Sequence, residues 1–407
     1  MELRAGYKQT EVGAIPEDWK VVRAGEIGRF RGGNGFPLKF QGQKSGTYPF
    51  YKVSDMNNEG NDIFMSDANN WLSEQVLSQI GATLFPANSI IFAKVGAAVF
   101  LERKKILSRP SCIDNNVAAL VLDKSKAEVR FIHCLMLNIK FGAFANATAL
   151  PSLSGATLFQ IQLTLPPLPE QQAIANALND VDDLIASLDR LIAKKRDIKQ
   201  AAMQQLLTGK TRLKGFSGEW ETKRLGTVIS IRNEKVNTLG SEIAAFCIEL
   251  EQIGQNSGQI DGHSDARGRQ TMKYRFERGD VLFGRLRPYL RKYWLAEREG
   301  VCSTEIWPLV TINEQLARDF LFQTVQSDAF IDAANSSYGT HMPRSDWKAL
   351  TQFEFLVPRD IAEQQAIGQL LCDMDAEMKE LQRRRDKSIE IKQGMMQELL
   401  TGRTRLI

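Results

Sequence analysis

The chain has few of the residues that metal sites and many catalytic centres depend on. It holds five cysteines and three histidines in 407 residues. No two cysteines form a Cys-x-x-Cys pair, so the sequence argues against structural zinc and a disulfide framework and favours buried, reduced thiols. No glycine-rich stretch continues into the Lys-Ser/Thr of a phosphate-binding loop, and the string RGGNGF at 31–36 predicts a turn or loop instead.

Long apolar runs are missing as well. No stretch approaches the roughly 18–20 residues that a membrane span needs, and residues 1–13 contain no apolar signal core. We therefore expect a cytoplasmic protein without membrane contact. The apolar fraction of 43% and the charged fraction of 25% are those of an ordinary globular protein, and the length suffices for two or three domains.

Pairs of reactive residues in the sequence have simple structural interpretations. His133 and Cys134 are adjacent in an apolar helical run, so they point to different faces, and a core histidine is the better interpretation. Asp182 and Asp183 lie on a predicted helix, where solvent exposure explains them. The Asn-Pro-Pro-aromatic motif of adenine amino-methyltransferases does not occur. No local catalytic centre is indicated, and we expect a protein without enzymatic activity, metal or bound cofactor of its own.

What the chain does contain is a long internal repeat. Residues 170–213 return as residues 363–406, each residue 193 positions later and without a gap. Solenoid repeats have periods of about 20–50 residues, so this period indicates duplication of a whole domain with a long helix. Further counterparts lie outside the segment: Trp19 and Trp220, Phe92 and Phe283, Lys94 and Arg285, Pro151 and Pro343. The intervening loops do not match, which predicts a shared framework with two different surfaces.

The repeated segments predict two long helices that share an apolar seam. Apolar residues recur in steps of four and three, as in a heptad pattern. The seam residues are Ile174, Leu178, Val181, Ile185 and Leu188 in the first copy, and Ile367, Leu371, Met374, Met378 and Leu381 in the second. Beyond them Ile192 is replaced by Arg385, so we expect the seam to fray or shift there. Apolar positions resume at Ile198, Met203 and Leu206 in the first copy, and at Ile391, Met396 and Leu399 in the second. Both helices end at the glycine of LLTG.

The helix length suits a spacer. Residues 170–207 would form a continuous helix of roughly 57 Å, compared with about 34–36 Å for one turn of B-DNA. We expect the two helices to pack as an antiparallel coiled coil with one domain at each end and an approximate two-fold axis. A parallel pair would place both domains at one end and remove the spacer role.

The rest of each half has a mixed α+β pattern. Short apolar runs at 89–100, 117–122 and 281–283 predict strands, and 129–139 and 316–326 predict helices. The expected fold class is therefore α+β, with two similar globular α/β domains separated by the two helices. The predicted segments are a first domain at 1–160, a first helix at 161–213, a second domain at 214–357 and a second helix at 358–407.

One segment is strongly basic although the net charge of the chain is only +4. Residues 265–294 hold nine basic and three acidic residues. Such an excess attracts phosphates and makes binding dependent on salt. The alternative interpretation is a solvated face without a ligand.

Several sequence strings together resemble one family. They are GYKQTEVGAIPEDWKVV near the N-terminus, the paired PPLPEQQAI and IAEQQAI, and the paired LLTGKTRL and LLTGRTRL. Over essentially its full length the chain resembles the specificity (S) subunit of type I restriction–modification systems. The resemblance implies two target recognition domains, each reading one half of a bipartite, asymmetric site on double-stranded DNA. It also implies helices that set the spacing and dock two methyltransferase (M) subunits, and through them the restriction/translocase (R) subunits. S-adenosylmethionine, ATP and Mg²⁺ would then be bound by those partners.

Candidate DNA-binding residues follow from side-chain chemistry. Arg, Lys, Asn and Gln reach base edges, and mostly Lys and Arg contact phosphates. The candidates in the first half are Lys39, Lys44, Lys52, Asn57, Asn58, Lys94, Arg103, Lys104 and Lys105; those in the second are Arg267, Arg269, Lys273, Arg285, Arg287 and Arg344. Lys94 and Arg285 occupy equivalent positions and are better candidates for backbone contacts than for base reading.

Three other interpretations remain open from the sequence. A fused restriction–methylation enzyme would need methyltransferase and nuclease motifs that the chain lacks. A related specificity subunit could serve a system whose partner combines cleavage and methylation. A two-domain scaffold without a nucleic-acid role would show no salt-dependent DNA affinity.

Overall fold

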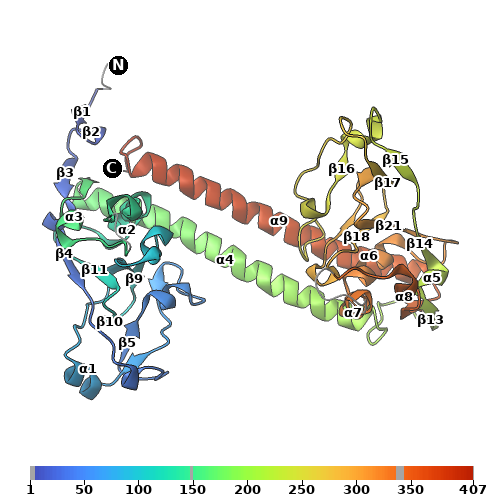
Figure 1. Ribbon diagram of the computed structural model, residues 1–407, viewed down its shortest axis with the longest axis horizontal. Helices are drawn as coiled ribbons and strands as arrows, with labels where there is room; N and C mark the ends of the chain where they lie inside the picture. Colours follow the sequence, from blue (N-terminus) through green and yellow to red (C-terminus); the bar gives the residue numbers. More distant parts are fainter. Residues whose placement is uncertain (1–4, 147–149, 336–342, 407) are drawn as a thin grey trace. The chain divides into compact units, whose positions relative to one another are not determined.

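The computed structural model describes residues 5–146, 150–335 and 343–406. It forms two compact units, Met1–Ala186 with Asp386–Ile407, and Ser187–Arg385. Helices α4 (Leu168–Leu206) and α9 (Ile361–Leu399) are each a single uninterrupted helix (Figure 1) and contribute residues to both units. Each compact unit thus includes part of both long helices. The division into four segments that the sequence suggests, with the helices counted separately, stays a prediction.

A five-stranded sheet forms the centre of the first unit. Its order is β4-β11-β8-β9-β6, with β4 Gly28–Gly32, β11 Val117–Leu122, β8 Ile90–Ala93, β9 Lys104–Leu107 and β6 Phe64–Met65. Successive side chains of a strand point to opposite faces. In β8, Ile90 and Phe92 therefore join the main core, while Ile91 joins a second apolar cluster on the other face. Burial on both faces explains why this strand is apolar throughout.

Smaller sheets and short helices complete the first unit. The remaining strands are β1 Tyr7–Thr10 with β2 Gly13–Pro16, β3 Lys20–Arg23 with β12 Gln162–Leu165, and β10 Cys112–Ile113, β5 Tyr48–Tyr51 and β7 Trp71–Leu72 in one three-stranded sheet. The helices are α1 Glu74–Ile80, α2 Val129–Asn138 and α3 Gly155–Phe159. The β3–β12 pair leads directly into α4.

The second unit repeats this plan with different details. Its central sheet has the order β14-β21-β18-β19, with β14 Ile229–Ile231, β21 Ile306–Thr311, β18 Val281–Gly284 and β19 Tyr293–Leu295. A second sheet has the order β15-β17-β20-β16, with β15 Lys235–Asn237, β17 Met272–Phe276, β20 Gly300–Cys302 and β16 Cys247–Ile248. In β18, Val281 and Phe283 enter one core cluster and Leu282 another, as in β8.

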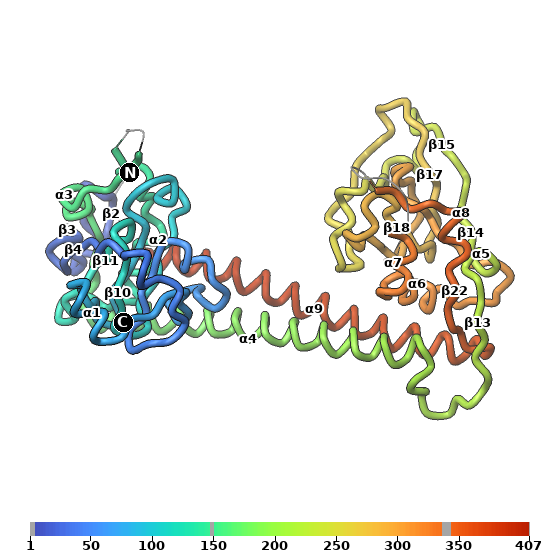
Figure 2. Tube along the Cα trace, turned by 60° about the horizontal axis from the view of Figure 1, so that its bottom comes forward, coloured from blue at the N-terminus to red at the C-terminus, as the bar shows by residue number. Residues whose placement is uncertain are grey.

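The connection into the second long helix also matches the first unit. Strands β13 (Trp220–Arg224) and β22 (Glu354–Pro358) pair antiparallel beside the start of α9 (Figure 2). The short helices are α5 Leu225–Val228, α6 Arg318–Gln326, α7 Asp328–Asn335 and α8 Trp347–Leu350. The predicted helices at 129–139 and 316–326 and the strand at 117–122 are confirmed. The predicted strand at 89–100 ends early, at Ala93, because the chain turns away at Gly96, which has a φ of +79°.

The two long helices run antiparallel within each unit, as predicted. In the second unit, three ion pairs join the helices, and as the residue numbers increase along α4, those of their partners on α9 decrease. They are Asp189–Arg385 at 3.5 Å, Lys195–Glu377 at 2.7 Å and Lys199–Asp375 at 2.6 Å. In the first unit, Lys392 lies 2.6 Å from Asp182. Asp182 is therefore mostly buried and paired, and the expectation that it is a solvated surface carboxylate is wrong.

The seam residues have two different environments. Ile174, Leu178, Ile367 and Leu371 are fully buried in the main cores of their units, because the first turns of each helix pack onto the sheets. Further along, Leu188 and Leu381 form a helix–helix cluster with Ile192. The remaining seam residues are half-buried: Val181, Ile185, Met374 and Met378.

Two details of the predicted seam are wrong. It does not fray at Ile192, which is buried against Leu188 and Leu381. It also does not resume at Ile198 and Ile391, which are 45% and 48% exposed, although the later positions Leu206 and Leu399 are buried as expected. The adjacent Lys199 and Lys392 turn inward in their place and pair with carboxylates of the other helix.

Candidate nucleic-acid interface and the sites that anchor the helices

The end of α9 is tied to the start of α4 by an ion pair that we call the first terminal ion pair. Arg405 Nε and Nη2 donate to the two oxygens of Glu170, at 2.6 and 2.7 Å. Trp19 Nε1 donates to Glu170 at 3.1 Å, and Asp18 accepts a second pair of hydrogen bonds from Arg405. Hydrogen bonds to Glu170 and Asp18 raise the pKa of Arg405, so its guanidinium stays protonated.

The end of α4 is tied to the start of α9 in the same way, by the second terminal ion pair. Arg212 Nη2 donates to Glu363 Oε2 at 2.6 Å, and the guanidinium lies 5.7 Å from the centre of the Trp220 ring. One difference is the indole: within the described part of the chain, the buried Trp220 Nε1 has no hydrogen-bond partner, whereas Trp19 Nε1 binds its glutamate.

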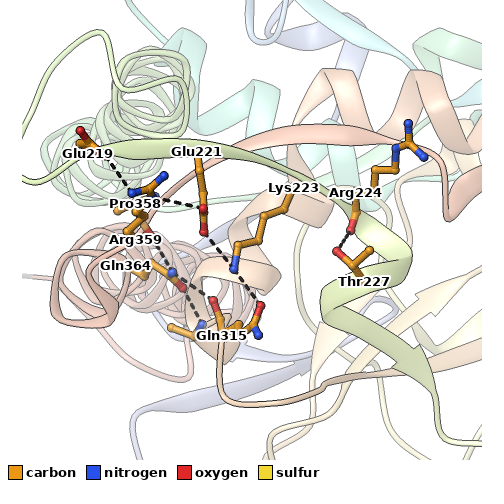
Figure 3. A network of polar contacts seen from close by, with 10 residues as sticks. Glu219, Glu221, Lys223, Arg224, Thr227, Gln315, Pro358, Arg359 and Gln364 are labelled. Atoms are coloured by element: carbon orange, nitrogen blue, oxygen red, sulfur yellow. Dashed lines mark hydrogen bonds and ion pairs between the residues drawn. The ribbon is translucent and has the colours of Figure 1, made fainter.

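The glutamine after each of these glutamates fixes the approach to the helix. Gln364 donates to the carbonyls of Pro358 at 2.7 Å and Gln315 at 3.2 Å, and accepts from Ala317 N–H (Figure 3). Gln171 makes the equivalent three bonds, to Pro166, Lys126 and Glu128. Figure 3 also shows Arg359 joined to Glu221 of the neighbouring strand β13 and to Glu219, which precedes that strand.

These contacts explain why the strings EQQ and TRL occur twice. Each buried Glu needs an Arg and each buried Gln satisfies three backbone groups, so a change in one partner leaves the other unsatisfied. The repeat is visible in the sequence, but the pairing is not, because each Arg binds the Glu of the opposite copy. The signal was present in the conserved spacing of the two strings, and sequence reasoning missed it.

Each unit presents basic residues where its central strand ends. We call residues 94–96 with 151–153, and 285–287 with 343–345, the strand-exit loops. Lys94 N–H donates to Asn116 and its carbonyl accepts from Leu153, at 2.8 and 2.9 Å. Arg285 makes the same bonds with Glu305 and Ser345, at 2.9 and 2.8 Å. The equivalence predicted for Lys94 and Arg285 is thus confirmed in backbone detail.

The strand-exit loop of the second unit holds three arginines, two of which lie at one carboxylate. Arg344 Nε and Nη2 lie 3.1 Å from the two oxygens of Glu305, and Arg285 Nε lies 3.6 Å from the same group. The Arg285 guanidinium also lies over the Trp307 ring, at 5.6 Å. Arg287 is exposed beside them. Three positive charges against one negative charge leave this surface suited to anions or base acceptors.

The other candidates of the first unit are scattered over its surface. Lys39, Lys44 and Asn57 are exposed, and Lys52, Asn58, Lys94, Arg103 and Lys105 are half-buried. Lys52 donates to Gln41, Asn58 to Asp67, and Lys105 to the carbonyl of Asp62. The side chains therefore include both free and structurally engaged groups, and their contact with DNA stays a prediction.

Lys104 is a correction to the candidate set. Its side chain is completely buried, with Nζ 2.6 Å from Glu102 and 4.4 Å from the centre of the Phe141 ring. Burial lowers the pKa of Lys104 in spite of the Glu102 carboxylate. The position corresponds to Tyr293 of the second unit, since both residues pair with the equivalent phenylalanine of the central strand. Lys104 thus supports the core and cannot reach a phosphate.

The basic segment 265–294 is largely neutralised by acidic residues, most of which lie outside the segment. Arg267 binds Asp265 and Glu242, and Lys273 binds Glu249. The other acidic partners of the segment are Glu234 and Glu299 for Arg275, Glu305 for Arg285 and Asp328 for Arg291. In residues 265–294, all of which are described, the side chains of Arg269, Arg278 and Arg287 are exposed with no ion pair or hydrogen bond. Arg278 was not among the candidates.

The described residues were compared with the requirements of a metal site and of a membrane-spanning helix. In residues 5–146, 150–335 and 343–406, no group of three or more His, Cys, Asp or Glu side chains is arranged to hold a metal ion. No helix of these ranges has both the length and the hydropathy to cross a bilayer. Four cysteines are buried and free, and Cys372 is half-buried and free. His133 is buried in the core, and His341 lies outside the described residues.

Comparison with known proteins agrees with this architecture. A family model of the type I restriction modification DNA specificity domain matches residues 16–199. The type I restriction enzyme MjaVIII specificity subunit of Methanocaldococcus jannaschii is 22% identical, over 98% of this chain and 96% of its own. The EcoDI specificity subunit of Escherichia coli is 21% identical, over 85% of this chain and 79% of its own.

Solved structures share the fold. The crystal structure of a type I restriction–modification S subunit from M. genitalium has a TM-score of 0.63 at 12% identity and covers 98% of both chains. A chain from a structure describing complex assembly and conformational transition of a type I system has a TM-score of 0.52 at 15% identity, covering 95% of this chain and 99% of its own. At these identities the likeness concerns the fold alone.

The fold, the duplicated anchors and the matched domain define a DNA-specificity protein with two α+β units and an antiparallel helix pair. More particularly, residues 16–199 match the type I restriction modification DNA specificity domain, and relatives that align over most of the chain are type I specificity subunits, so the resemblance drawn from the EQQAI and LLTG strings is confirmed.

Proposed function

We propose that the chain is the non-catalytic subunit that gives a type I restriction–modification complex its sequence specificity, with each unit reading one half of a bipartite, asymmetric DNA site. The observation that carries the proposal is one anchoring framework repeated around two units whose surface loops differ. The first strand-exit loop offers Lys94, and the second offers Arg285, Arg287 and Arg344. Two unlike readers on a common framework suit a split, asymmetric target.

We also propose that α4 and α9 dock two methyltransferase subunits and, through them, the restriction/translocase subunits. Each helix repeats the other, so one chain offers two related surfaces. Large apolar side chains are exposed on both helices, which supports a protein partner there. They are Leu168, Leu184, Leu191 and Ile198 on α4, and Leu370, Ile389 and Ile391 on α9. In this proposal the partners bind S-adenosylmethionine, ATP and Mg²⁺ and supply the chemistry, and the complex acts on DNA in the cytoplasm.

Selection from a random duplex library tests the proposal. The full chain with its methyltransferase partner should enrich one motif of two short specified segments separated by an unread gap, in a manner that weakens with salt. Failure to enrich a split motif would contradict the reading role and favour the scaffold interpretation. Methylation of DNA by the chain alone, with S-adenosylmethionine supplied, would contradict the non-catalytic assignment.

The unread gap offers a second test. We propose that the helix pair sets its length. Inserting one heptad at matching positions of both helices keeps the apolar seam in phase. The enriched motif should then keep both specified segments and change only the number of base pairs between them. Altered segments with an unchanged gap would contradict a spacing role for the helices.

A further inference from the structure

Arg287 has a backbone conformation that an arginine rarely adopts. It follows β18 and has φ +52° and ψ +61°, in the left-handed region. Side chains other than glycine and asparagine are disfavoured there. The next residue is Pro288, and a residue before proline favours an extended backbone. Two independent preferences therefore oppose this conformation at Arg287.

The first unit shows that the same loop does not require an arginine. Gly96 occupies the equivalent position with φ +79°, and its N–H donates to Pro151 at 2.7 Å. Arg287 N–H donates to Pro343 at 2.8 Å in the same way. The ψ angles differ, at −174° for Gly96 and +61° for Arg287, and glycine adopts a positive φ without strain. The second unit thus makes the same backbone hydrogen bond with a strained arginine at a position where the first unit has a glycine.

Two other left-handed residues, Arg291 in the second unit and Glu102 in the first, have a structural reason that Arg287 lacks. Arg291, with φ +51°, binds Asp328 and the carbonyl of Gln326. Glu102, with φ +55°, accepts the N–H groups of Phe141 and Gly142 and pairs with Lys104. The Arg287 side chain is exposed and, among the described residues, makes no hydrogen bond or ion pair. Strain without an internal contact points to a group outside the chain.

The surroundings hold the backbone at Arg287 in place. The chain at Leu286 pairs with Arg344 as an isolated β-bridge, and Ser345 donates its N–H to Arg285 and its hydroxyl to Ala334. Arg344 is held by two hydrogen bonds to Glu305. A guanidinium on so fixed a frame is suited to a ligand with directed acceptors, whereas a phosphate contact requires no such frame.

We propose that Arg287 reads a guanine in the half-site of the second unit, through the O6 and N7 acceptors in the major groove. The planar guanidinium matches these two atoms with two parallel hydrogen bonds. This inference rests on the proposed DNA-reading function and assigns one residue and one base to it. The second unit is thereby expected to require a guanine, at a position that the first unit, with Gly96, cannot read in this way.

The test combines a protein change with a base-analogue change. The bipartite motif is first determined with the wild-type complex, and each guanine of one half-site is then replaced by 7-deazaguanine, which lacks the N7 acceptor. One replacement should weaken wild-type binding roughly 5-fold, the lower end of the range for loss of a whole bidentate contact, because O6 is kept. Binding by the Arg287→Ala complex should already be weaker and should not respond to that replacement.

Two further variants separate this role from a structural one. Arg287→Gly removes the strain and should melt at a higher temperature than the wild type while losing the same discrimination. Arg291→Gly changes a left-handed arginine with an internal partner and should leave DNA selectivity unchanged. The inference is overturned if no guanine in the half-site responds to 7-deazaguanine, or if Arg287→Ala weakens all sequences equally, as a phosphate contact would. If the wild-type complex selects no motif at all, the proposed function itself fails, which is a different result.

Discussion

Arg212→Ala would leave the carboxylate of Glu363 buried without its cation, and the structure allows the cost to be estimated. The side chain of Glu363 is 0% exposed and that of Arg212 is 28% exposed. Removing one partner of a buried ion pair costs about 3–5 kcal/mol. Because water can enter where the guanidinium was, we expect the lower end, about 3 kcal/mol. The matching Arg405→Ala change should cost about 1 kcal/mol less, since Glu170 keeps the hydrogen bond from Trp19.

Hydrogen exchange measured peptide by peptide is the appropriate assay, because a protein with two units need not unfold in one step. In Arg212→Ala, peptides around the start of α9 and around Trp220 should lose protection, while those of the first unit keep theirs. Arg383→Ala is the control, because its exposed pair with Glu380 is worth at most about 0.5 kcal/mol. Equal losses in Arg212→Ala and Arg405→Ala, or none in either, would refute the reasoning.

Three further predictions follow from the same contacts. Burial lowers the pKa of His133 to about 4 from an ordinary 6.5, so the unfolded chain takes up a proton more readily than the folded first unit. The free energy of unfolding of this unit should therefore fall by about 3 kcal/mol as the pH drops from about 6.5 to about 4. In denaturant titrations His133→Gln should remove this part of the pH dependence, and an unchanged dependence would contradict the prediction. Leu178→Asp places a carboxylate in the main core of the first unit rather than only in the helix seam, so it should cost at least about 4 kcal/mol and unfold that unit, whereas native melting would refute the burial. Exchanging residues 214–357 for those of a relative should change one half of the DNA motif only, and a change in both halves would show that the units do not read independently.

The local pattern of the sequence was enough for the helices and for the plan of the fold. Heptad spacing depends on nearby residues only, which is why the long helices and their glycine ends were predicted. The duplication was visible because both copies kept the same residues at the same spacing. Predicting an antiparallel pair needed one further argument, that a spacer must carry its two domains at opposite ends of the helix pair. Within the second unit, the ion pairs of Lys195 and Lys199 confirm the antiparallel direction of the helices.

The candidate DNA-binding residues were less predictable. Charge counted along a segment ignores acids that fold back onto it, so residues 265–294 looked more basic than their surface is. Lys104 looked like its exposed neighbours in the sequence, but strand alternation turns it into the core against Phe141. Arg287 was only one candidate among many until its backbone conformation set it apart.

By itself, the sequence determined that two similar units exist, that each continues into a long helix, and that their loops differ, because repeats, periodicity and composition are properties of neighbouring residues. Only the tertiary structure decided which charges neutralise one another, which lysine is buried, and that each TRL arginine binds the glutamate of the opposite copy. Those facts depend on contacts between residues 151 and 235 positions apart, and no local pattern records such distances.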